Sequence, residues 1–170
     1  MNEQQHARGR TILIVDDIAS SRAALSLLLR DDYHVELAED GAKAITVSAS
    51  AHPPDLILMN ANMPVLDGYE VCRRLKANPL TQGIPVVFLL AAHDLEREAR
   101  CFEMGGSDYI IQPFVPVTVR ARVRTQLALK ASATAEAVTI FALTSLAETR
   151  DSDTGNHILR TQNYVKCLAQ

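Results

Sequence analysis

Residues 55–64 read DLILMNANMP, and this stretch decides which kind of fold the chain adopts. Segment 55–59, in which all residues after Asp55 are apolar, predicts a strand that is covered on both faces, as strands of parallel sheets are. The run ends at Asn60, and a loop that contains Pro64 follows. Ligands of parallel α/β sheets bind where the strands end. Asn60 therefore stands at an expected site of chemistry, although an amide lacks the anionic oxygen of a carboxylate nucleophile.

The same alternation of short apolar runs and longer helical stretches continues on both sides of this segment. We expect strands at residues 11–15, 34–38, 55–59, 84–90 and 108–112. We expect helices at residues 20–31, 40–51, 66–77 and 94–105, with a last helix after the PFVP segment 113–116. Asp40 is a plausible N-cap of the second helix. Five such units predict an α/β fold, with a five-stranded parallel sheet and helices on both faces.

The composition excludes some classes of protein. Of the 170 residues, 48% are hydrophobic and 22% are charged, which is typical of a soluble globular protein. The net charge of −3 argues against nucleic acid or an anionic membrane as a partner. The polar first ten residues do not resemble a signal peptide, and the apolar run 86–92 is too short to cross a bilayer. Three scattered cysteines without a CxxC pair suit a reducing compartment, so we expect a cytoplasmic protein.

Polar residues follow the first and third expected strands. Asp16 and Asp17 come directly after residues 11–15, and Asn60 ends the third strand. Two adjacent carboxylates repel each other unless a cation offsets their charge. Alternatively, Asp16 and Asp17 cap the following helix and interact with its dipole. Taken alone, the two aspartates favour the capping interpretation.

Four segments of the sequence, taken together, favour a binding site over the capping interpretation. They are ILIVDD (12–17), PDLILMNANMPVLDGYEVCRRLK (54–76), IPVVFLLAA (84–92) and GGSDYIIQPF (105–114). In this order they strongly resemble the bacterial response-regulator receiver domain, over about residues 10–130. The resemblance implies a sheet with the strand order 2-1-3-4-5.

The resemblance also implies roles for residues at the strand ends. In the family, an acidic pair, here Asp16 and Asp17, binds magnesium together with a backbone carbonyl, here that of Asn62. The family's phosphoacceptor aspartate corresponds to Asn60, which cannot form an acyl phosphate. The amide also removes one formal charge from the metal site, so we expect Mg²⁺ binding to be weakened and not required.

Three further switch positions follow from the same resemblance. The Thr or Ser that contacts the phosphoryl oxygen corresponds to Leu90, which has no hydroxyl. The Lys before the cis-proline turn corresponds to Gln112, which has no cation to offset developing charge. Tyr109 matches the aromatic switch residue. Because Asn60, Leu90 and Gln112 all lack the reactive group, the sequence predicts a natural pseudo-receiver. The alternative is a conventional phosphoacceptor receiver whose acceptor aspartate was replaced by Asn60.

The last residues carry a second resemblance. SLAETRDSDTGNHILRTQNYVKCLAQ (145–170) looks like the opening of an HD-GYP domain, a metal-dependent module that hydrolyses cyclic di-GMP. The matching residues are Glu148, Arg150, Asp151, Thr154, Gly155, His157 and Arg160. Asp153 and His157 correspond to metal ligands of an intact domain, whereas in isolation they read as a helix N-cap and an exposed histidine. The family's His-Asp pair and Gly-Tyr-Pro loop are absent from the 170 residues, so we expect no hydrolysis by this chain, only by a longer parent protein.

The region 121–150 has no Gly or Pro and is rich in Ala, which predicts a long helix. One face of this helix, counted from just before residue 121, is roughly apolar. Its residues are Val119, Val123, Leu127, Val138 and Phe141, and Ala131 and Thr134 fall near the same face. Such a face favours a homodimer through the last receiver helix and the linker helix, and packing in an Ala-rich core is the alternative.

The expected organisation has four parts along the chain. They are a disordered tail (1–9), a receiver-like domain (10–128), a linker helix (129–147) and the beginning of an HD-GYP domain (148–170). The predicted function is a signal-transduction regulatory module of a two-component response regulator. It dimerises, controls a C-terminal cyclic di-GMP phosphodiesterase, and has a sensor kinase as a candidate partner.

Overall fold

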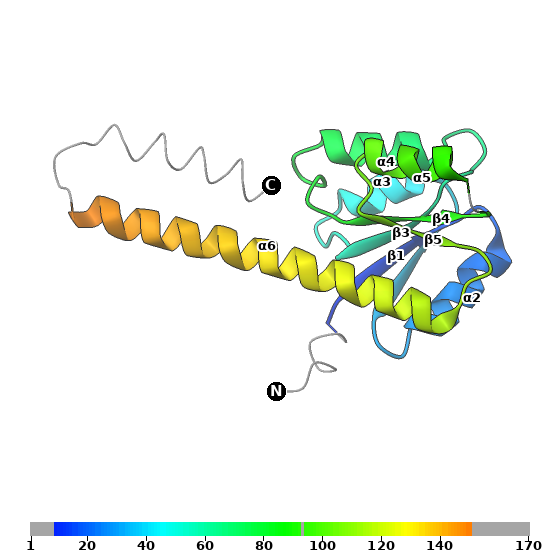
Figure 1. Ribbon diagram of the computed structural model, residues 1–170, viewed down its shortest axis with the longest axis horizontal. Coiled ribbons are helices and arrows are strands. Elements are labelled where there is room, and N and C mark those ends of the chain that lie inside the picture. Colours follow the sequence, from blue (N-terminus) through cyan, green and yellow to red (C-terminus); the bar gives the residue numbers. More distant parts are fainter. Residues whose placement is uncertain (1–8, 93, 151–170) are drawn as a thin grey trace. The chain divides into compact units, whose positions relative to one another are not determined.

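A computed structural model describes residues 9–92 and 94–150, with side chains up to residue 143. It contains a five-stranded parallel sheet with the order β2-β1-β3-β4-β5 (Figure 1). The strands are β1 (Thr11–Val15), β2 (His34–Ala38), β3 (Leu56–Asn60), β4 (Val86–Leu90) and β5 (Asp108–Ile111). The predicted fold class and strand order are confirmed.

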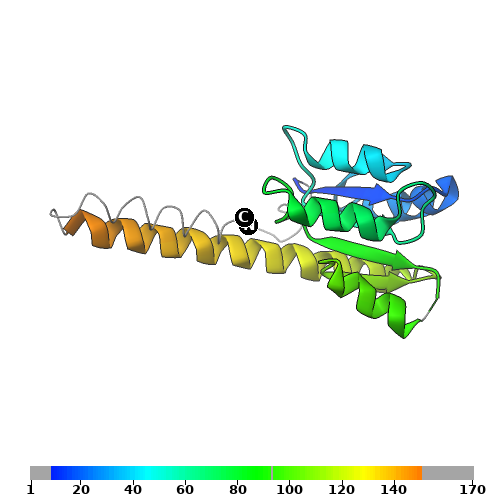
Figure 2. The ribbon, with the colours of Figure 1, turned by 90° about the horizontal axis from the view of Figure 1, so that it is seen from above.

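Five helices accompany the strands. They are α2 (Ala19–Leu29), α3 (Gly41–Ser48), α4 (Gly68–Ala77), α5 (Leu95–Glu103) and α6 (Pro116–Arg150). Helices α3, α4 and α5 cover one face of the sheet, whereas α2 and the first part of α6 cover the other (Figures 1 and 2). Both faces of the sheet are therefore buried, as the continuous apolar strands predict.

The two faces of the sheet produce two separate hydrophobic cores. Along β1, Leu13 and Val15 contribute to the core under α3, α4 and α5. Ile12 and Ile14 contribute to the core under α2 and α6. All four side chains are fully buried, because successive residues of a strand point to opposite faces.

Aspartate residues cap the N-termini of three helices. Asp40, Asp67 and Asp94 accept hydrogen bonds from backbone N–H groups in the first turns of α3, α4 and α5, at 2.8, 2.7 and 3.0 Å. The predicted N-cap Asp40 is confirmed. Helix α3 ends at Ser48 rather than at residue 51, and the N–H of its C-cap residue Ala49 donates to the carbonyl of Ile45.

The apolar face predicted along the last helix divides into two parts. Val119, Val123 and Leu127 are buried in the core of the sheet domain. Val138 and Phe141 are 62% and 44% exposed. The first three residues therefore pack in the core of their own domain and cannot contact a partner helix, whereas dimerisation through the rest of the helix stays a prediction.

Two of the three cysteines lie among the described residues. Cys72 and Cys101 are buried, and burial raises the pKa of each thiol to about 11, which keeps both thiols protonated at neutral pH. Cys167, Asp153 and His157 lie outside the described residues, as does most of the predicted tail.

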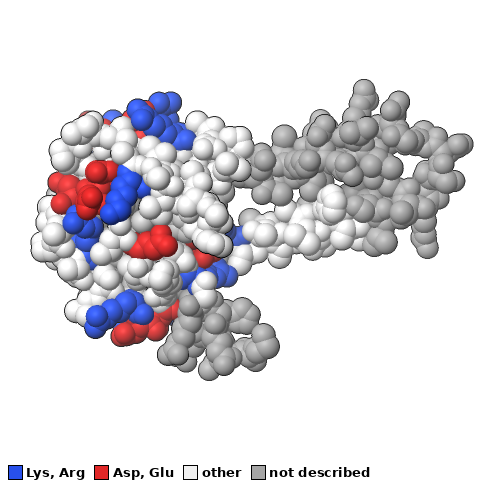
Figure 3. All heavy atoms as spheres, turned by 180° about the vertical axis from the view of Figure 1, so that it is seen from behind, with Lys and Arg blue, Asp and Glu red and all other residues white. Residues whose placement is uncertain are grey.

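Among the described helices, none is both long and apolar enough to cross a membrane. Acidic and basic side chains are intermixed on the face of the domain shown in Figure 3.

The loop between β3 and α4 stores backbone strain at Val65. Val65 has a φ of 67°, and the N–H of Leu66 donates to the carbonyl of Pro64 at 2.8 Å across a three-residue turn. A β-branched residue is disfavoured at positive φ because its side chain crowds its own backbone. The Val65 side chain is fully exposed, so no packing offsets this cost.

Replacement of Val65 by glycine should therefore stabilise the protein. We expect the free energy of unfolding to rise by about 0.5–1 kcal/mol, since relief of strain outweighs the extra chain entropy of glycine. Urea unfolding measures the change. V65A is the matched control, because it keeps a Cβ and should gain less than V65G. A loss of stability in V65G would show that the turn is not strained.

Candidate functional site

The carboxyl ends of β1 and β3 bring Asp16, Asp17 and Asn60 together. The two strands are neighbours, with Val15 paired to Met59. The Nδ2 of Asn60 donates to Oδ1 of Asp17 at 3.0 Å and to Oδ1 of Asp16 at 3.3 Å. The carboxamide thus bridges the two carboxylates, which come from one loop, and links them to the neighbouring strand.

The orientation of the Asn60 amide follows from its surroundings. Its Oδ1 accepts a hydrogen bond from the backbone N–H of Asn62 at 3.1 Å. In the flipped orientation, the carbonyl oxygen would face two carboxylate oxygens and the NH₂ would face another N–H. Only the observed orientation pairs every donor with an acceptor. Asn60 therefore presents an electropositive N–H edge to Asp16 and Asp17.

Asp16 is the buried member of the acidic pair. Its side chain is fully buried, and its Oδ1 accepts from the N–H of Ile18 at 2.8 Å. Its Oδ2 has no partner among the described residues, and Arg22 Nη1 donates to its backbone carbonyl. Burial raises the pKa of Asp16, and the neighbouring charge of Asp17 raises it further.

The capping interpretation of the acidic pair is wrong. The N-cap residue of α2 is Ile18, and no side chain caps that helix. Asp16 and Asp17 precede the cap, and their Oδ1 atoms both lie within hydrogen-bond distance of Asn60. The pair therefore belongs to the strand-end site rather than to the helix terminus.

The next two strands place Leu90 and Gln112 beside each other at the same edge of the sheet. The N–H of Gln112 donates to the carbonyl of Leu90 at 2.8 Å. Leu90 is fully buried in the core under α3, α4 and α5. Gln112 is half-buried and precedes a cis peptide bond to Pro113, as the resemblance implied. Neither residue offers a hydroxyl or a cation to the site.

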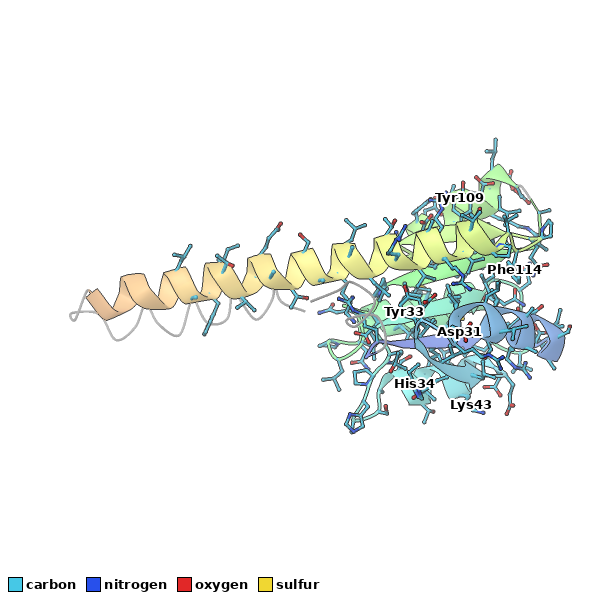
Figure 4. The ribbon with its side chains drawn as sticks, turned by 90° about the horizontal axis from the view of Figure 1, so that it is seen from below. Asp31, Tyr33, His34, Lys43, Tyr109 and Phe114 are labelled. Carbon is cyan, nitrogen blue, oxygen red and sulfur yellow. The ribbon has the colours of Figure 1, made fainter. Side chains whose placement is uncertain are left out.

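Tyr109, labelled in Figure 4, lies on the edge strand β5, and its side chain contacts two residues of α5. Its hydroxyl donates to Oε2 of Glu98 at 2.6 Å, and its ring meets that of Phe102 edge-on, with 5.9 Å between the centroids. The bond to Glu98 raises the pKa of Tyr109. Sequence reasoning missed Glu98, because no spacing pattern joins it to a residue eleven positions away on another element.

Gly68 positions the start of α4 against the end of β3. Its N–H donates to the carbonyl of Ala61 at 3.0 Å. A Cβ on Gly68 would lie 2.2 Å from the carbonyl oxygen of Asn60. The close approach requires glycine here, and it fixes the loop that carries Asn60 and Asn62.

The residues at this site do not fit a magnesium ion in the observed arrangement. Mg²⁺ requires oxygen ligands in near-octahedral geometry, and the hydrogen bonds of Asn60 bring two carboxylates together here, those of Asp16 and Asp17. The NH₂ of Asn60 points at both carboxylates, so a cation would have to displace it. No cluster of three or more His, Cys, Asp or Glu side chains that could hold a metal occurs in the described ranges.

The chain is similar in sequence and in fold to several known proteins. A probable cyclic di-GMP phosphodiesterase of Vibrio cholerae is 40% identical over 94% of this chain, and the chain spans 41% of that protein's length. A crystal structure assigned to a response regulator of Chloroflexus aurantiacus has a TM-score of 0.68, with 34% identity over 71% of this chain and 99% of that one.

A third relative contains a magnesium ion. The receiver domain of the sensor histidine kinase PA1611 from Pseudomonas aeruginosa has a magnesium ion coordinated in its active-site cleft. It is 30% identical over 71% of this chain and 98% of that one, with a TM-score of 0.65. Residues 12–124 of the present chain match the family of response regulator receiver domains. With the sheet order and the strand-end site described above, the chain belongs to that family.

Proposed function

We propose that this domain is a pseudo-receiver, which regulates without accepting a phosphoryl group. The observation that carries the proposal is the carboxamide of Asn60 at the acceptor position, with its N–H groups directed at Asp16 and Asp17. An amide nitrogen in this position is neither anionic nor free to attack phosphorus. Buried Leu90 and uncharged Gln112 support the same conclusion, because neither can stabilise a phosphoryl group.

The regulated activity in this proposal is a C-terminal HD-GYP phosphodiesterase of a longer protein. The likeness to the Vibrio cholerae protein supports this, because it covers 94% of the chain and so extends beyond residues 12–124. Hydrolysis of cyclic di-GMP would belong to that longer protein and not to the receiver domain. A sensor kinase would then act on the domain by binding rather than by phosphoryl transfer.

Self-association is the proposed means of regulation. Four large apolar side chains near the end of the described part of α6 are exposed; they are Val138, Ile140, Phe141 and Leu143. Glu136 is the only charged residue between positions 131 and 143. A helical segment of this composition is stabilised by packing against another helix, and a second copy of the chain supplies one.

The phosphorylation proposal predicts no reaction with a phosphodonor. Incubation with acetyl phosphate and Mg²⁺ should leave the intact mass of the protein unchanged. N60D alone should also stay unmodified, because Leu90 and Gln112 still lack the hydroxyl and the cation. The triple variant N60D/L90T/Q112K is the positive control, and it should acquire a phosphoryl adduct.

Two outcomes of this experiment would contradict the proposal in different ways. An adduct on N60D alone would indicate a conventional receiver that one substitution has silenced. An adduct on the natural chain, mapped to Asp16 or Asp17, would indicate a domain that still accepts phosphoryl groups by another route.

A further inference from the structure

The contacts of Asn60 suggest a role beyond the loss of a phosphoacceptor. Asp16 and Asp17 are adjacent in sequence, and both direct Oδ1 toward the end of β3. Carboxylates this close repel each other unless positive charge or hydrogen-bond donors offset the repulsion. In the receiver domain of PA1611 a magnesium ion is coordinated in the active-site cleft of that protein, whereas here the NH₂ group of one carboxamide donates to both carboxylates.

Other polar groups near the pair do not replace the carboxamide. Ile18 N–H reaches only Oδ1 of Asp16. The charge of Arg22 lowers the pKa of Asp16, but its hydrogen bond goes to the backbone carbonyl of Asp16, so it holds neither carboxylate in place. Oδ2 of Asp16 is buried and has no partner among the residues the structure describes. The carboxamide of Asn60 is the group that contacts both carboxylates in these hydrogen bonds.

The Asn60 side chain also forms hydrogen bonds with the loops that follow two neighbouring strands. Its Oδ1 accepts from Asn62 N–H, and the N–H of Ala61 donates to the carbonyl of Leu89 on β4. The side chain of Asn60 therefore ties the loop after β1 to the loop after β3. A bound cation would link the same two loops.

We propose that the Asn60 carboxamide is an internal substitute for the divalent cation, which keeps the acidic pair in place and makes the domain independent of Mg²⁺. The inference rests on the proposed function, since a domain that exchanges no phosphoryl group needs no metal for chemistry. It assigns Asn60 a positive structural role, rather than only the absence of a carboxylate.

Thermal unfolding of the full chain with and without millimolar MgCl₂ tests the inference, with NaCl at equal ionic strength as the control. The Tm of the natural chain should not respond to Mg²⁺. N60D should unfold roughly 5 °C lower without Mg²⁺, because three carboxylates then meet. Mg²⁺ should restore most of that loss, since a ligand of the folded state stabilises it.

N60A separates the bridging role from the charge that N60D adds. It removes the amide without a new carboxylate, and it should lower Tm to a similar degree. In the N60A background, D17N should recover part of the loss because it removes the repulsion, whereas D17N alone should not raise Tm. N60A with unchanged Tm would overturn the inference.

Direct metal binding gives a readout that does not depend on the variants folding. Mn²⁺ added to the natural chain should keep its full electron paramagnetic resonance signal, as free Mn²⁺ does. Loss of that signal at micromolar Mn²⁺, or a rise in Tm with Mg²⁺ as large as that of N60D, would overturn the inference. Neither result would create a phosphoryl adduct, so failure of this inference is distinguishable from failure of the proposed function.

Discussion

Replacement of Gly68 by alanine should destabilise the domain by about 3 kcal/mol or more. The new Cβ would lie 2.2 Å from the carbonyl oxygen of Asn60 and 3.0 Å from Cγ of Met59. The carbonyl belongs to a central strand, where Asn60 pairs with Leu89 of β4, so it cannot move aside as a flexible side chain can. A decrease in the free energy of unfolding would itself indicate the close contact, because an exposed helical Gly→Ala change normally stabilises by up to about 1 kcal/mol.

G9A is the matched control for this prediction. A Cβ on Gly9 would meet nothing within 4 Å, so G9A should change the free energy of unfolding by less than about 0.5 kcal/mol. Urea unfolding of the two variants measures the difference. G68A with the stability of the natural chain would show that α4 does not approach the end of β3 as closely as described.

The architecture could be predicted from the sequence because both faces of the sheet are buried. Strands β1 and β3 each contain four consecutive apolar residues, and the stretches between the strands have helical periodicity. The ends of the strands were less predictable where apolar residues continue beyond the residues that form the hydrogen bonds of the sheet. The fourth strand was expected from residue 84 and begins at Val86, after Pro85, which has no N–H for the ladder.

The site was predictable in position but not in its contacts. Strand ends of a parallel sheet meet at one edge, so Asp16, Asp17 and Asn60 were expected together, and they are. The direction of the Asn60 amide depends on the backbone N–H of Asn62, which no pattern of residue types specifies. The bond between Tyr109 and Glu98 depends on how α5 packs against β5, which is likewise a property of the fold.

The long helix shows most clearly what residue spacing leaves open. Val123 and Val138 were both assigned to one apolar face, because they are of the same type and recur at compatible helical spacings. Val123 is fully buried against the sheet, whereas Val138 is 62% exposed. Periodicity says that an apolar face will be covered, but the elements that cover it come from elsewhere in the chain or from another chain.

V123A should destabilise the domain by about 2–3 kcal/mol, whereas V138A should change its stability by less than about 0.5 kcal/mol. The first substitution removes two buried methyl groups and leaves a cavity in the core under α2 and α6. The second removes the same groups from a side chain that is already in contact with water. Both variants lie on α6, so their helix propensities change alike and the difference reports burial alone. Urea unfolding at low micromolar concentration, where association is weakest, is the appropriate measurement.

Self-association of the same two variants should respond in the opposite way. If a second copy covers the exposed part of α6, V138A should weaken the dimer several-fold in analytical ultracentrifugation, because the lost contact lies in the interface. V123A, whose side chain faces the core of its own domain, should leave the dimer affinity of the folded protein unchanged. A natural chain that stays monomeric at high micromolar concentration would contradict dimerisation through this segment. Equal loss of stability in both variants at low concentration would instead show that Val138 is covered within a single chain.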